Sequence, residues 1–206
     1  MIAPPFHIAI LAFDGVEALD FAGPFEVFTT AVRMALRQAP EPGSVAAHWQ
    51  VDCVASTLSP VQARAGLRLL PSLDFAQSRR TDLLIVPGGV VDAAMACPAT
   101  LAWVNTMAQG APITASICTG AFILAAAGVL RAGPVTTHWE DVDDLQERFP
   151  QLDVQTGQRW IDNGRTVTSA GISAGIDMSL HLVERLAGRA LALRTARQMD
   201  YPWQDA

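Results

Sequence analysis

Hydrophobic positions along this chain fall into two patterns, and each pattern predicts one kind of secondary structure. Short apolar or alternating runs that stop at turn residues predict strands, and the first of these cover residues 8–13, 49–55, 83–86 and 113–117. Longer stretches with apolar residues at every third or fourth position predict helices, which cover residues 23–36, 98–109, 121–127, 140–149, 173–186 and 189–199. The first helix is expected to open at Gly23 and Pro24, because a helix accepts proline in its first turn.

Smaller segments complete the pattern. Residues 59–70 predict a hairpin, and further short strands, with a turn at 162–164, are expected at residues 135–137, 154, 159–161 and 167–168. Because strands and helices alternate without a repeat or linker, we expect an α/β fold with a flavodoxin-like, doubly wound, mostly parallel sheet and helices on both faces. The length of 206 residues is that of about one domain, so we predict a single domain over residues 1–206.

Composition and charge exclude several classes of protein. Hydrophobic residues make up 50% of the chain and charged residues only 17%, which excludes a disordered protein. All 14 basic residues are arginine, and without lysine the chain can form neither a Schiff base nor a Walker A phosphate loop. The net charge of -6, with the arginines scattered, predicts no nucleic-acid partner.

Cysteines, histidines and apolar stretches limit the expected cofactors and location. The three cysteines, Cys53, Cys97 and Cys118, are odd in number and widely spaced, which predicts no disulfide framework and a reducing compartment. The four histidines lack metal-ligand spacing, so we predict no metal and no other cofactor. No apolar stretch approaches the ~20 residues that span a bilayer, and no leader-like segment is present, so we expect a cytoplasmic protein without a membrane partner.

The carboxyl ends of the predicted parallel strands supply the candidate chemistry, because ligands bind there in folds of this class. Cys118 directly follows the fourth predicted strand and precedes a helix. We therefore expect it at a sharp nucleophile elbow, where the helix N-terminus favours the thiolate. Asp20 follows the first strand, and Gly88 and Gly89 follow the third. Two adjacent glycines let backbone N–H groups approach a ligand and stabilise developing negative charge.

Each candidate also has a purely structural interpretation. A cysteine is most often a buried apolar residue, and we adopt that interpretation for Cys53 and Cys97. Asp20 could cap the helix that follows it, and the glycine pair could be only a tight turn. An isolated histidine such as His138 is more often a hydrogen-bonded structural residue than a catalyst.

Five short motifs match a known pattern: Leu-Asp-Phe-Ala-Gly-Pro at 19–24, Val-Pro-Gly-Gly at 86–89, Ser-Ile-Cys-Thr-Gly-Ala at 116–121, Thr-Thr-His-Trp at 136–139 and Ser-Ala-Gly-Ile-Ser-Ala-Gly-Ile-Asp at 169–177. With them the chain resembles, over nearly its whole length, the ThiJ/PfpI superfamily of small relatives of class I glutamine amidotransferase domains. Within the superfamily it is most similar to isocyanide hydratases and to the ligand-binding half of AraC-type regulators.

The resemblance to the hydratases implies an activity and a set of site residues. Cys118 would be the nucleophile, Asp20 the acid that carries a proton, and Thr119 the third member of the catalytic set. Gly88 and Gly89 would lie at the substrate or oxyanion site, and His138 corresponds to a histidine that lies near the cysteine in other branches. The implied reaction converts a small-molecule isocyanide to an N-substituted formamide through a covalent thioimidate, without a cofactor.

Other branches of the superfamily lead to alternatives. Thr119 stands where the protease-like branch carries histidine, which disfavours a peptidase pairing. Only about 20 residues follow Leu186, too few for the helix-turn-helix domain of a regulator, so we expect a freestanding enzyme. The alternative is a non-catalytic ligand-binding or redox-sensing domain related to AraC-type regulators. Members of the superfamily are commonly dimers, so we expect a homodimer.

Overall fold

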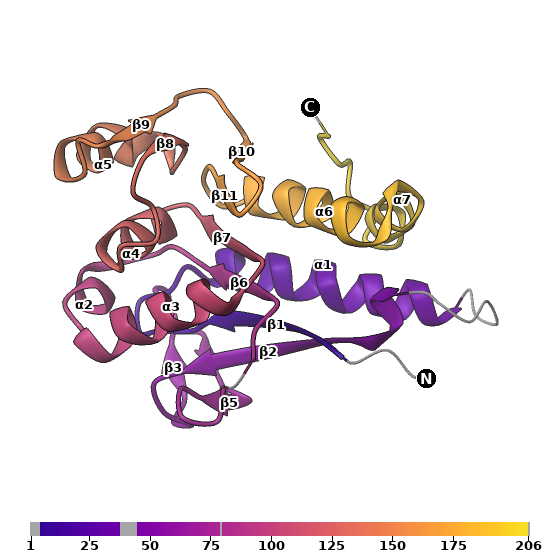
Figure 1. Ribbon diagram of the computed structural model, residues 1–206. Coiled ribbons are helices and arrows are strands. Elements are labelled where there is room, and N and C mark those ends of the chain that lie inside the picture. The colour runs from indigo at the N-terminus through magenta and orange to yellow at the C-terminus, as the bar shows by residue number, and fades with distance from the viewer. Residues whose placement is uncertain (1–4, 38–44, 79, 206) are drawn as a thin grey trace.

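A seven-stranded sheet runs through the computed structural model, which describes residues 5–37, 45–78 and 80–205 (Figure 1). Its strand order is β10-β11-β7-β6-β1-β2-β5, and all neighbours are parallel except the β10–β11 pair. The strands are β1 Phe6–Leu11, β2 Trp49–Ala55, β5 Leu73–Asp74, β6 Leu83–Val86, β7 Ile113–Ile117, β10 Trp160–Asp162 and β11 Thr166–Ser169. Two small sheets pair β3 Val61–Gln62 with β4 Arg68–Leu69 and β8 Gly133–Val135 with β9 Leu152–Val154.

Helices cover both faces of the large sheet. On one face, α1 packs with α6 and α7, and on the other α2, α3 and α4 pack together (Figure 1). The helices are α1 Ala18–Arg37, α2 Asp92–Met95, α3 Pro98–Gly110, α4 Gly120–Ala126, α5 Val142–Arg148, α6 Ala174–Ala187 and α7 Arg189–Gln198, with 3-10 turns η1 Val45–His48 and η2 Trp139–Asp141. This arrangement confirms the predicted doubly wound α/β fold.

The central strands are apolar because helices bury both of their faces. Every residue of β6 and β7 is buried, and in β6 all four side chains have no exposed surface. In the sequence β6 therefore reads as an unbroken apolar run, whereas β7 also carries Thr114 and Ser116. The predicted hairpin at 59–70 is also present, as the antiparallel pair β3 and β4. The short elements β5 and α2 carry too little pattern to be predicted and were missed.

The start of the first helix differs from the sequence prediction. The helix begins at Ala18, so Pro24 lies inside it rather than in its first turn. Proline lacks a backbone N–H, which leaves the carbonyl of Asp20 without its usual partner four residues later. Gly23 packs closely against α6, because an added Cβ would lie 3.0 Å from a side-chain carbon of Ile176. The earlier start places Asp20 in the first turn and buries it completely, instead of leaving it as an exposed cap.

The strand order brings together the three turns that carry the candidate site residues. Strand β1 lies between β2 and β6, and β7 lies beyond β6, so the carboxyl ends of β7, β6 and β1 are adjacent. The chain leaves β1 towards one side of the sheet and β6 towards the other, which makes this edge a switch point of the kind where α/β proteins bind ligands. The turns after these three strands carry Asp20, the glycine pair and Cys118.

Two further findings concern the described residues only. None of their helices combines the length and the apolar character needed to cross a membrane. They also hold no cluster of three or more histidine, cysteine or acidic side chains that could bind a metal ion.

Candidate active site

Cys118 occupies a strained elbow between β7 and α4. Its φ angle of 55° lies in the left-handed region, which a non-glycine residue adopts only when its surroundings enforce it. Its amide donates to the carbonyls of Ser169 and Ala170 at 3.1 and 3.3 Å, and its own carbonyl accepts from the Thr137 hydroxyl at 2.9 Å. Gly120 completes the elbow, because an added Cβ would lie 2.1 Å from the carbonyl oxygen of Val86.

Asp20 lies buried beside Cys118. Its Oδ2 accepts from the amide of Gly88 at 3.2 Å, whereas the buried Oδ1 has no hydrogen-bond partner of normal geometry among the described residues. Burial raises the pKa of this carboxyl to about 7. The Cys118 side chain and the Gly88 amide oppose that rise, and the charge of Glu17 adds to it. Asp20 is thus poised to gain or lose a proton near neutral pH.

The Cys118 thiol is protonated at rest, which corrects the expectation of a preformed thiolate. Burial raises its pKa to about 12, and the negative charge of Asp20 adds to the rise. The amides of Thr119 and Ile172 lower the pKa but do not compensate for these two effects. The dipole of α4, a helix of seven residues, is therefore outweighed by desolvation and by a like charge.

The glycine turn after β6 holds the acid and Thr119 in place. Gly88 has no room for a side chain, because an added Cβ would lie 2.6 Å from the Thr119 amide and 2.9 Å from Oδ2 of Asp20. The Thr119 hydroxyl accepts from the Gly89 amide and donates to the Gly89 carbonyl, both at 2.9 Å. Both glycine amides are thus directed at protein groups, and their part in stabilising substrate charge stays a prediction.

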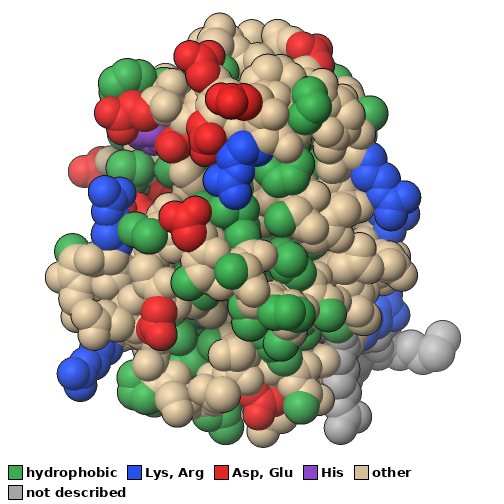
Figure 2. All heavy atoms as spheres, turned by 90° about the vertical axis from the view of Figure 1, so that its left-hand side faces the viewer, with side chains coloured by type: hydrophobic (Ala, Val, Ile, Leu, Met, Phe, Trp, Pro, Cys, Tyr) green, Lys and Arg blue, Asp and Glu red, His purple; other side chains and the backbone are tan. Residues whose placement is uncertain are grey.

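A cavity of about 370 Å³ opens above the cysteine. Three acidic residues, Glu17, Glu140 and Asp141, line it, and Figure 2 shows acidic side chains close to a histidine on the face turned to the viewer. The one arginine of the lining, Arg64, lies 3.8 Å from Glu17 and so offsets part of this charge. Ten residues line the cavity: Glu17, Arg64, Gly89, Val90, Cys118, Thr119, His138, Glu140, Asp141 and Ile172.

His138 lines the same cavity but its ring faces acidic neighbours. Nδ1 accepts from the Glu140 amide at 3.3 Å and lies 3.4 Å from a carboxylate oxygen of Asp141. Burial raises the pKa of Asp141, and His138 opposes that rise. Gly171 packs against the ring so closely that an added Cβ would lie 2.1 Å from Cδ2. Its ring makes no hydrogen bond with Asp20 or Cys118 among the described residues, and its part in binding a substrate stays a prediction.

Sequence reasoning missed several residues of the site. Ile172 has a φ angle of 45°, and its amide lies close enough to Cys118 to lower the pKa of the thiol. Arg64 comes from the β3–β4 hairpin and Val90 from the turn after β6. Of these three residues, only Ile172 lies within one of the five sequence motifs, the segment at 169–177. Only its place in the site could therefore have been predicted.

The other two cysteines lie outside this site. Cys53 is buried on β2, and burial raises the pKa of its thiol to about 11, as suits a small apolar residue. Cys97 differs from the expectation, because it is only partly buried and the Thr100 side chain and amide lower the pKa of its thiol. Cys97 is therefore the cysteine with the greatest thiolate character at neutral pH.

Comparison with known proteins extends these observations. The DJ-1/PfpI family profile matches residues 7–185. The isonitrile hydratase of Pseudomonas putida is 33% identical over 196 residues, covering 95% of this chain and 78% of the relative. The HTH-type transcriptional regulator CdhR of Pseudomonas aeruginosa is 31% identical over 170 residues, and the matched part is 80% of this chain but only 50% of the regulator. A ThiJ/PfpI family protein from Pseudomonas syringae, 28% identical, superimposes with a TM-score of 0.83 over 98% of this chain and 77% of that structure.

Proposed function

This chain belongs to the DJ-1/PfpI family, and from that premise we propose that it hydrates an isocyanide to an N-substituted formamide, with Cys118 as nucleophile. One observation carries the proposal: the buried thiol of Cys118 lies beside a carboxyl, Asp20, whose pKa is raised to about 7. Such a carboxyl can both accept and return a proton at neutral pH, which the hydration of an isocyanide requires.

The first step forms the thioimidate. Asp20 accepts the proton of the Cys118 thiol, and the sulfur attacks the terminal carbon of the isocyanide. Asp20 then delivers that proton to the same carbon, so one S–C bond and one C–H bond form as the S–H bond breaks. The product is a thioimidate, in which carbon is doubly bonded to nitrogen. Because burial and the charge of Asp20 raise the pKa of the thiol, the proton would leave the sulfur as the sulfur attacks the substrate.

The second step releases the formamide. Water adds to the thioimidate carbon while the nitrogen gains a proton, and the resulting tetrahedral species loses the sulfur. The sulfur takes back a proton, and the net change is the addition of one water molecule to the isocyanide, with no change of oxidation state. Asp20 would serve as base towards water and then as acid towards sulfur.

The surrounding groups have supporting roles in this proposal. Thr119 and Gly89 hold each other through two hydrogen bonds, and the Gly88 amide fixes Oδ2 of Asp20. The amides of Thr119 and Ile172 approach the sulfur and would stabilise negative charge there in the transition state. An isocyanide carries no net charge, which suits a rim where acidic side chains outnumber the single arginine.

The similarity to CdhR favours a second candidate, a domain that binds a small molecule without turning it over. A redox sensor based on Cys118 is less well supported, because oxidation proceeds through the thiolate and the pKa of this thiol is raised to about 12.

The test of the proposal is a turnover assay with matched variants. The purified protein is incubated with an aromatic isocyanide, and formamide is followed by chromatography. The hydratase proposal expects turnover that Cys118→Ser abolishes and Cys53→Ser leaves intact. Absence of turnover, or turnover that survives Cys118→Ser, would reject it. Saturable binding of the isocyanide without turnover would favour the ligand-binding domain.

A further inference from the structure

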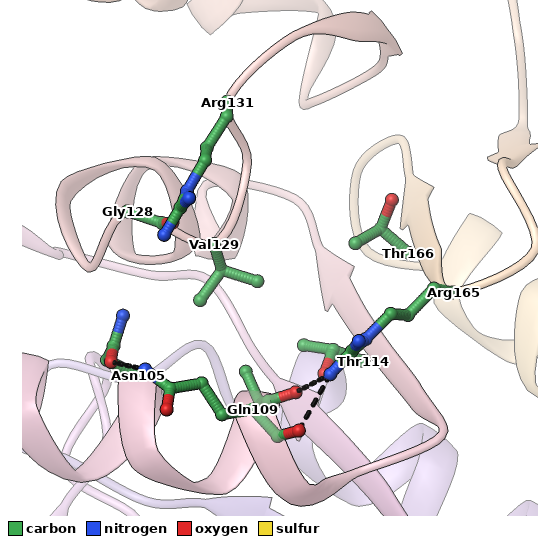
Figure 3. A pocket seen from close by; sticks show the side chains of 9 residues that line it. Asn105, Gln109, Thr114, Gly128, Val129, Arg131, Arg165 and Thr166 are labelled. Atoms are coloured by element: carbon green, nitrogen blue, oxygen red, sulfur yellow. Dashed lines mark hydrogen bonds between the residues drawn. The ribbon is translucent and has the colours of Figure 1, made fainter.

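A second cavity lies at the end of the sheet opposite Cys118 (Figure 3). Its volume is about 290 Å³, and it is bounded by the carboxyl end of α3, the turn after α4 and the amino ends of β7 and β11. Thr114 lies near the start of β7, whereas Cys118 follows its last residue. The strand rises about 3.3 Å per residue, so the two places are separated by roughly 13 Å. This cavity is therefore distinct from the candidate active site.

Two arginines reach this cavity from different segments. Arg131 follows α4, and Arg165 precedes β11 (Figure 3). The lining contains no acidic residue, and among the described residues no carboxylate lies within 4.0 Å of either guanidinium. The chain has a net charge of -6, yet this cavity is lined by two arginines and by no carboxylate. The cavity is therefore positively charged in a chain that is acidic as a whole.

Backbone carbonyls account for only part of the arginines' hydrogen-bonding capacity. Nη2 of Arg165 donates to the carbonyls of Ala108 and Gln109 at 3.0 and 2.7 Å, and Nε of Arg131 donates to the carbonyl of Gly128 at 2.8 Å. A guanidinium has five N–H donors. The hydrogen bonds above leave donors on both side chains available to a ligand.

The helix ends do not neutralise the charge of the cavity. The carboxyl ends of α3 and α4 meet here, and a helix carboxyl end carries roughly half a negative charge. Two guanidinium groups therefore leave an excess of about one positive charge. That excess favours a ligand with at least one negative charge.

A buried hydroxyl supplies the second, independent observation. Thr114 lines the cavity with 1% of its surface exposed, and its Oγ1 has no hydrogen-bond partner among the described residues. A buried hydroxyl without a partner is costly, so such groups are normally satisfied. This oxygen is sealed from the cavity as it stands, and rotation about χ1 would turn the hydroxyl towards the cavity, where an oxygen of a bound ligand would accept its hydrogen bond.

We propose that this cavity binds a small oxyanion, the carboxylate or phosphate group of a metabolite. Planar guanidinium groups bind both groups through pairs of hydrogen bonds, and a hydroxyl adds a further donor. The cavity volume is at the lower limit of small-molecule sites, which suits a small metabolite. The proposal is independent of the reaction at Cys118.

Calorimetric and NMR titrations at low ionic strength test the proposal. The protein is titrated with sodium phosphate and, separately, with sodium acetate, and sodium chloride at equal ionic strength corrects for screening. We expect saturable binding of at least one oxyanion, with amide shifts centred on Thr114, Gly128 and Thr166. The anion that saturates distinguishes a phosphate site from a carboxylate site.

Matched variants make the test specific. Thr114→Val is nearly isosteric, and both it and Arg131→Gln are expected to weaken binding by about tenfold. Arg197→Gln is the control, because Arg197 is exposed on α7 and lies outside the cavity. The proposal is overturned if neither oxyanion saturates, if the shifts centre elsewhere, or if Thr114→Val and Arg131→Gln bind like the wild type.

Discussion

Asp20 and Cys118 change each other's proton affinity in opposite directions. The charge of Asp20 raises the pKa of the thiol, whereas the Cys118 side chain lowers the pKa of the carboxyl. This is the relationship of a thiol that donates towards a carboxylate, with the proton resident on sulfur. Burial raises both pKa values and brings that of the carboxyl to about 7. The proposed hydration would use this pair to accept and return a proton at neutral pH.

Replacing Asp20 by asparagine tests the proton carrier. Asp20→Asn is expected to lower kcat/KM by about 10² to 10⁴, the usual contribution of general acid–base catalysis. The same change removes a negative charge, so the pKa of the Cys118 thiol is expected to fall, as measured by thiolate absorbance in the ultraviolet. Asp92→Asn, at an exposed position on α2, is the control. Unchanged turnover in Asp20→Asn would show that another group carries the proton.

The pH dependence of kcat/KM follows from the same carboxyl. Asp20 must be ionised to accept the thiol proton, and its pKa is raised to about 7. We expect kcat/KM to fall as the pH drops below about 7, and Asp20→Glu to shift that limb. A profile that is flat between about pH 5 and about pH 9 would contradict the assignment.

The stability of the fold is expected to decrease as the pH rises towards neutrality through Asp20. The pKa of this carboxyl is raised from 3.8 to about 7 by burial, so between these values the folded state holds a proton that the unfolded state has lost. Stability then falls with rising pH. Asp20→Asn lacks this pH dependence. The free energy of unfolding of Asp20→Asn minus that of the wild type, measured with urea, should therefore rise by on the order of 2–4 kcal/mol from pH 4 to pH 8. A difference independent of pH would refute a raised pKa.

The three cysteines are expected to react in an order set by their thiol pKa values. Cys97 has a lowered pKa and is partly exposed, whereas burial raises the pKa of Cys53 to about 11 and that of Cys118 to about 12. Iodoacetamide at neutral pH should therefore modify Cys97 first, as followed by peptide mass spectrometry. Earlier modification of Cys118 would support a thiolate at rest and revive the redox-sensor alternative.

Gly120 is expected to be essential for the elbow. Gly120→Ala would place a Cβ 2.1 Å from the Val86 carbonyl, whereas a Cβ at Gly110, on the last turn of α3, meets no atom within 4 Å. We expect Gly120→Ala to lower the free energy of unfolding by about 3 kcal/mol and Gly110→Ala to change it by less than about 1 kcal/mol. Denaturant unfolding of both variants makes the comparison. Equal stabilities would show that the elbow can shift without cost.

The sequence predicted most strands of the large sheet because buried parallel strands leave short runs made mostly of apolar and small residues. The runs at 83–86 and 113–117 became β6 and β7, and the position of Cys118 after β7 followed directly. The start of α1 was predicted five residues late, because Pro24 is a strong local signal for a first turn. In the structure the helix already includes Gly23, which lies close to Ile176 on α6, so Pro24 falls inside it.

Local sequence therefore determined the strands, the order of elements, the elbow and, through the motifs, the identity of the candidate acid and nucleophile. Only the tertiary structure decided the protonation of Cys118, because desolvation and the charge of Asp20 depend on what lies around the sulfur in space. It also decided that Arg64 joins the active-site rim and that Arg131 and Arg165 share a second cavity with Thr114. These groups are distant in the chain, and no local pattern records which of them the fold brings together.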